Sequence, residues 1–203
     1  MVQIGSGSVS GGLGSMIAGG KFWDGFRQGV ITAALNHFAH ELILKPIAVN
    51  RMRSALINGG VDPDANPVIE KSSIIHLIEN VDEIGRLYEV GGKPGFEIKH
   101  LGGDYGRYDP QSKTVYIAPK AFTSNLSLAF AVGHELVHAT HFHSGLYRRL
   151  LQKSSNGVAV RNYSEVLAWR WELQWGSPGA PRQIREYTKG VGGWFNIFER
   201  MNR

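Results

Sequence analysis

The chain has 203 residues, no cysteine and a formal net charge of +5. This length allows a substantial hydrophobic core and suggests one or two domains. The lack of cysteine excludes a disulfide framework and thiol chemistry. No run of about 18 apolar residues occurs, and the start lacks the pattern of a signal peptide, so we expect neither a membrane span nor classical secretion.

Positive charge is concentrated in the last part of the sequence. Residues 1–144 contain 12 Lys and Arg against 13 Asp and Glu, whereas residues 145–203 contain 10 against 4. Such an excess can attract an acidic peptide, a nucleic acid or an acidic partner protein, or can be an ordinary solvated surface. Because no zinc-finger, RNA-binding or phosphate-binding motif accompanies it, we do not expect nucleic-acid binding.

The first sixty residues differ in composition from the rest. Nine glycines occur before residue 30, and the apolar pattern of residues 30–44 predicts an amphipathic helix that ends before Pro46. Two prolines lie within residues 62–67, and prolines commonly mark a break in regular structure. We therefore predict a glycine-rich connector over residues 1–60 and a second domain over residues 61–203.

The second domain begins with one helical pattern and two strand patterns. An apolar stripe predicts a helix over residues 67–90. Alternating segments predict strands over residues 96–101 and 114–118, with turn-forming residues between them. We expect these strands to form a short antiparallel sheet.

Two further helices are predicted after the strands. Residues 125–143 contain no proline and follow Thr123 and Ser124, either of which can cap a helix. Residues 162–172 also have a helical pattern, which stops before a glycine and a proline. Together with the strands, these helices predict an α+β fold.

The helix over residues 125–143 carries a metal-binding motif. His134 and Glu135 are followed by His138 in a His-Glu-x-x-His pattern. Residues four apart lie on one face of a helix, so both imidazoles can bind one Zn²⁺. Glu135 would stand beside the metal, where its carboxylate can take a proton from a bound water. The pattern predicts a zinc hydrolase; the alternative is a pair of core histidines held by hydrogen bonds.

A catalytic zinc normally has a third protein ligand. Glu165 lies on the second helix, 27 residues after His138, and an antiparallel arrangement of the two helices would bring it to the metal. Alternatively, Asn162 and Glu165 form a capping box at the start of that helix. Glu172, two turns further, and His141, one turn beyond His138, are reserve ligands. His141 would require the first helix to bend or to end early.

The motif and its surroundings resemble a known group of enzymes. The segment GHELVHATHFHSG with the later YSEVLAW is similar to gluzincin metallopeptidases, and more narrowly to the metallopeptidase toxin domains of bacterial polymorphic toxins and injected effectors. The glycine-rich opening over residues 11–42 resembles the connector of Rhs-type toxins. The resemblance implies a zincin-like fold, delivery by a parent toxin or secretion apparatus, a cognate immunity protein, and cleavage of a protein in the cytoplasm of a target cell.

For such a domain we expect a peptidase mechanism. Zn²⁺ held by the two histidines and Glu165 would polarise the scissile carbonyl, while Glu135 would move a proton from water to the leaving amine. Tyr187 is our candidate donor to the oxyanion, with His141 and His143 as alternatives. As an edge strand above the site, residues 114–118 would pair with an extended peptide, by analogy with zincins.

Two other interpretations stay open. The chain can be a non-peptidase zinc hydrolase, or a non-catalytic module whose metal is structural or which only docks a partner. A structural site would fill the fourth position of the metal with a protein ligand such as His141. Only a catalytic site needs Glu135. In such a site, replacement of Glu135 by alanine would remove activity and keep the metal.

Overall fold

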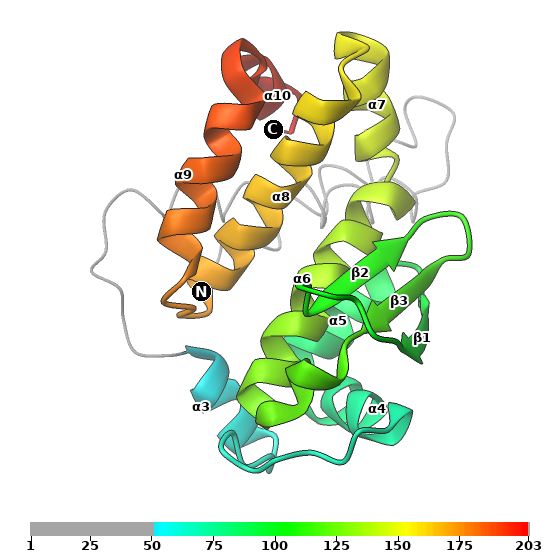
Figure 1. Ribbon diagram of the computed structural model, residues 1–203, viewed down its shortest axis with the longest axis vertical. Coiled ribbons are helices and arrows are strands. Elements are labelled where there is room, and N and C mark those ends of the chain that lie inside the picture. Colours follow the sequence, from blue (N-terminus) through cyan, green and yellow to red (C-terminus); the bar gives the residue numbers. More distant parts are fainter. Residues whose placement is uncertain (1–50, 203) are drawn as a thin grey trace, which may run out of the picture.

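The computed structural model describes residues 51–202; the predicted helix over residues 30–44 and most of the glycine-rich connector lie outside them. Within the described residues the fold is α+β and mostly helical, with one small sheet, as predicted (Figure 1). In chain order the elements are α3 (Arg51–Asn58), α4 (Lys71–Asn80), α5 (Asp82–Val90), β1 (Gly95–Ile98), β2 (Gly106–Asp109), β3 (Thr114–Ile117), η1 (Pro119–Thr123), α6 (Asn125–His143), α7 (Leu146–Ser154), α8 (Gly157–Gln174), α9 (Ala180–Val191), η2 (Gly192–Trp194) and α10 (Phe195–Met201).

The sheet is mixed, with the strand order β1-β3-β2. β3 pairs in parallel with β1 and antiparallel with β2, so that Val115 lies between Phe96 and Tyr108. The prediction of an antiparallel sheet with residues 114–118 at its edge is therefore wrong, because β3 is paired on both sides. The strand missed was β2, which is only four residues long and begins and ends with Gly106 and Asp109, residue types that favour turns.

The segment predicted as one helix over residues 67–90 forms two helices. α4 ends at Asn80 and α5 begins at Asp82, with Val81 in an extended conformation between them. The side chain of Asn80 donates a hydrogen bond to the backbone carbonyl of His76 (2.8 Å), which satisfies an acceptor at the end of α4. Buried residues on both helices continue the predicted apolar stripe across the break.

α6 is the central helix of the described residues. Figure 1 shows the sheet and α5 on one side of α6 and α8 on the other, and each of them packs against it. Ser124 accepts a hydrogen bond from the backbone N–H of Ser127 (3.0 Å), which confirms the predicted cap. Gly133 allows α8 to approach α6 closely, because its α-carbon faces the indole ring of Trp171.

Two hydrophobic clusters fill the interior of the described residues. The first contains residues of α3, α4, α5 and α6, of the sheet and of the end of α8. Met52 and Leu56, which precede the predicted start of the second domain, belong to it. The other joins α7, the first half of α8, α9 and α10, and Tyr163 packs there against Phe198. α8 thus belongs to both clusters. Between residues 51 and 202, no helix has both the length and the apolar character needed to cross a membrane.

Candidate metal centre

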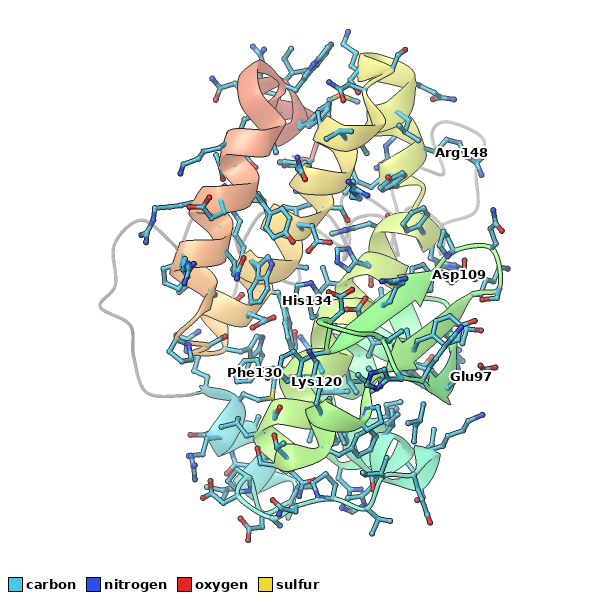
Figure 2. All side chains as sticks on the ribbon, viewed as in Figure 1. Glu97, Asp109, Lys120, Phe130, His134 and Arg148 are labelled. Atoms are coloured by element: carbon cyan, nitrogen blue, oxygen red, sulfur yellow. The ribbon has the colours of Figure 1, made fainter. Side chains whose placement is uncertain are left out.

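His134, His138 and Glu165 form a group that could hold a metal ion. One ligand atom from each residue lies within 4.8 Å of the other two. Nε2 of His134 lies 3.4 Å from Oε2 of Glu165, and Nε2 of His138 lies 3.4 Å from Oε1 of the same carboxylate. His134 lies near the middle of the molecule, between α6 and α8 (Figure 2). The three predicted ligands therefore come together as donors around one point.

Helix geometry explains why these three residues meet. His134 and His138 are one turn apart on α6, so their rings lie on the same face, with centroids 5.0 Å apart. α8 returns antiparallel to α6 (Figure 1). Glu165 on α8 thereby lies next to both histidines. α8 begins at Gly157 and is capped by Asn156, so Glu165 lies inside the helix and the predicted capping box with Asn162 is wrong.

The electrostatics of the group favour a positive charge. Burial by itself would lower the pKa of His134, but hydrogen bonds with Glu165 and Glu172 outweigh burial and raise that pKa to about 10. Burial would raise the pKa of Glu165, yet hydrogen bonds with His134 and His138 hold it far below its usual range. The carboxylate thus stays ionised, as a metal ligand must be.

Glu172 contacts the other nitrogen of His134. Its Oε1 lies 2.8 Å from Nδ1, and both side chains are buried. This contact directs Nε2 of His134 towards Glu165 and fixes the tautomer, which is the usual role of a carboxylate behind a metal-bound histidine. The ring of Trp169 packs edge-on against His134, with centroids 4.9 Å apart. The reserve ligand Glu172 therefore orients His134 instead of joining the three-residue group.

Ser164 connects His138 with the other reserve ligand, His141. The Oγ of Ser164 lies 2.9 Å from Nδ1 of His138 and 2.8 Å from Nδ1 of His141. His141 is 1% exposed, and burial, with the nearby His138, lowers its pKa to about 3. Neutral His141 can accept the single O–H of Ser164, which leaves an oxygen lone pair free to accept the N–H of His138. No local sequence signal distinguished Ser164 from its neighbours, so prediction missed it.

We expect the exchange of Ser164 for alanine to weaken metal binding about 10-fold or more, since the orientation of His138 would lose its support. Competition with a coloured chelator measures this affinity. Ser127 lies on α6, away from the three ligands in the chain, and its replacement by alanine serves as the control. Equal affinities of the two variants would mean that packing alone orients His138.

Glu135 lies beside the ligands and under the sheet. It is 7% exposed, and its side chain is in contact with Gly106 at the start of β2. Burial raises the pKa of Glu135, while the charges of His134 and His138 act in the opposite direction. A raised pKa strengthens a carboxylate as a proton acceptor, which is the property that the predicted base requires.

Tyr187 and His143 were two of the candidates for the oxyanion donor. Tyr187 on α9 is partly buried; burial raises its pKa, and the charges of Glu165 and Asp104 raise it further. These influences come from α8 and from the loop before β2. His143, at the end of α6, lies instead against Gly92. Tyr187 therefore lies within electrostatic range of the candidate ligand Glu165 and stays the candidate donor.

The arrangement has both buried and accessible parts. The side chains of His138 and Glu165 keep 12% and 23% of their surface exposed, so the group is not completely buried. Two imidazoles and a carboxylate are a donor set that suits Zn²⁺ in catalytic sites.

Comparison of the chain with protein-family models, with curated proteins and with solved structures finds no match.

Proposed function

We propose that this chain is a zinc-dependent metallopeptidase. The observation that carries the proposal is the convergence of His134, His138 and Glu165, with the buried carboxylate of Glu135 beside them. Three protein ligands leave the fourth position of a tetrahedral zinc to water or substrate, which distinguishes catalytic from structural sites. Bound zinc would supply a water of lowered pKa and an electrophile for the scissile carbonyl.

The protein side chains have separate tasks in this proposal. Glu135 accepts the proton of the attacking water and gives it to the leaving amine. The hydroxyl of Tyr187 is the donor that stabilises the oxyanion, a contribution of about 100-fold or more in other hydrolases. Glu172 and Ser164 keep the imidazole ligands in the orientation that the metal needs.

The resemblance of GHELVHATHFHSG to bacterial toxin domains extends the proposal to a biological role. As an effector, the chain would be delivered by a parent toxin or a secretion apparatus and cleave a protein in the cytoplasm of the target cell. Its basic last part, with 10 Lys and Arg against 4 Asp and Glu, suits an acidic substrate or an acidic immunity protein.

Structural zinc binding is the less favoured alternative. It requires a fourth protein ligand, and His141 was the candidate. In the described residues the metal-ligand group comprises His134, His138 and Glu165 without His141. A non-peptidase zinc hydrolase would use the same groups. Parallel assays with protein substrates and with non-peptide esters and amides distinguish a peptidase from such a hydrolase.

The decisive test of the site is its metal content. We expect about one zinc per purified wild-type chain and a sharp loss after the exchange of Glu165 for alanine, because two imidazoles alone hold zinc weakly. Elemental analysis after purification without added metal measures both. Glu186→Ala, a change of an exposed glutamate on α9, is the control. Zinc retained in Glu165→Ala would assign the third ligand to another residue, and a wild-type chain that stays metal-free after reconstitution would disprove the enzyme proposal.

A further inference from the structure

Gly106 is the first residue of β2 and lies directly against the side chain of Glu135. A β-carbon at this position would be 2.6 Å from Cγ of Glu135, 2.9 Å from Oε1 and 3.1 Å from Cδ. The backbone of Gly106 has no positive φ, so the conformation itself would accept any residue. Glycine is therefore required here by the space that Glu135 occupies.

The backbone on each side of this contact is held in place. Gly106 pairs with Ile117, which is 0% exposed, and the adjoining backbone bond from Ala118 N–H to the carbonyl of Tyr105 (2.9 Å) fixes the start of the strand. Glu135 belongs to the middle of α6 and is itself buried. β2 and α6 thus form the two walls of a narrow slot around the Glu135 side chain, with Gly106 as the wall on the strand side.

We propose that Gly106 is a positioning residue, which sets the place of the Glu135 carboxylate relative to the candidate ligands His134, His138 and Glu165. The inference rests on the proposed function for its catalytic consequence, while the slot itself is a property of the described structure. A methyl group at position 106 would press on the side chain of Glu135, whose Cγ, Oε1 and Cδ are the three atoms nearest to it. The base would be displaced and the metal ligands would stay in place.

The first part of the test is the exchange of Gly106 for alanine. We expect unchanged zinc content and KM but a kcat about 100-fold lower, because a displacement of about 1 Å in a catalytic group can have this effect. Gly103→Ala is the matched control, since a β-carbon at Gly103 meets nothing within 4 Å and its φ is not positive. Loss of zinc in Gly106→Ala, or a wild-type kcat, would overturn the inference.

The second part uses thermal stability and needs no activity. Glu135→Ala removes the three atoms that a β-carbon at Gly106 would meet. Gly106→Ala should therefore lower Tm by about 5 °C in the wild type and by less than about 1 °C in the Glu135→Ala background. An equal decrease of Tm in both backgrounds would show that the two residues are not coupled and would overturn the inference. If the wild-type chain cleaves no peptide, the proposed function fails. The Tm comparison in the two backgrounds still tests whether Gly106 and Glu135 are in steric contact.

Discussion

Replacement of Glu135 by glutamine is expected to reduce peptide-bond hydrolysis by at least about 100-fold and to leave one zinc per chain. Glutamine has the shape of glutamate and therefore fits the slot between α6 and β2. Its amide cannot accept the proton of the attacking water, so the loss would come from chemistry alone. Rates with a protein substrate, together with elemental analysis of the same sample, measure the two quantities.

The matched control is Glu97→Gln on β1, which removes an exposed carboxylate on the sheet (Figure 2). It should have wild-type rates and metal content. Residual activity of Glu135→Gln near the wild-type level would assign the base to another group. Loss of zinc from Glu135→Gln would instead mean that Glu135 supports the ligands, and the assignment of a catalytic role would then fail.

Replacement of Gly133 by alanine is expected to destabilise the fold by about 3 kcal/mol, with Tm lower by roughly 10 °C. A β-carbon there would overlap Cη2 at the edge of the six-membered ring of Trp171, and would lie 2.6 Å from Cζ3 and 2.7 Å from Cζ2. Trp171 is 1% exposed, is in contact with Phe130, and donates a hydrogen bond from Nε1 to the buried Glu83 (3.3 Å). The indole therefore cannot move aside, and α6 would have to separate from α8.

Thermal unfolding of the metal-free protein measures this effect without a contribution from ligand binding. The control is Gly157→Ala at the start of α8, where a β-carbon would meet only Leu151, at 3.9 Å. That change should be neutral or slightly stabilising, because alanine favours a helix more than glycine does. A similar Tm for Gly133→Ala and Gly157→Ala would show that the interface between α6 and α8 is looser than the structure indicates.

The features that were predictable from the sequence are local ones. The bounds of α6, its Ser124 cap and the position of His134 and His138 on one face depend on residues within a few turns of one helix. The arrival of Glu165 required only that a second helix return antiparallel. Each of these depends on spacing along the chain, which the sequence contains directly.

The features that were missed depend on contacts between distant residues. β2 is recognisable as a strand only through its pairing with β3, because Gly106 and Asp109 are turn-forming types. Ser164 has a role only because α8 brings it to His138 and His141, and nothing in its own neighbourhood indicates this. The break between α4 and α5 at Val81 likewise contains no glycine or proline that would indicate it in the sequence.

The candidate ligands also connect the two hydrophobic clusters. His134 and His138 belong to the helix at the centre of the first cluster, whereas Glu165 lies on the part of α8 that packs in the second. A cation held by all three residues binds only when the clusters are docked, so its binding energy adds to the stability of the fold. At a free concentration of 1,000 times its Kd, the gain is about 4 kcal/mol. In the proposed effector role, the zinc supply of the receiving compartment would thus control the folded fraction as well as the catalytic rate.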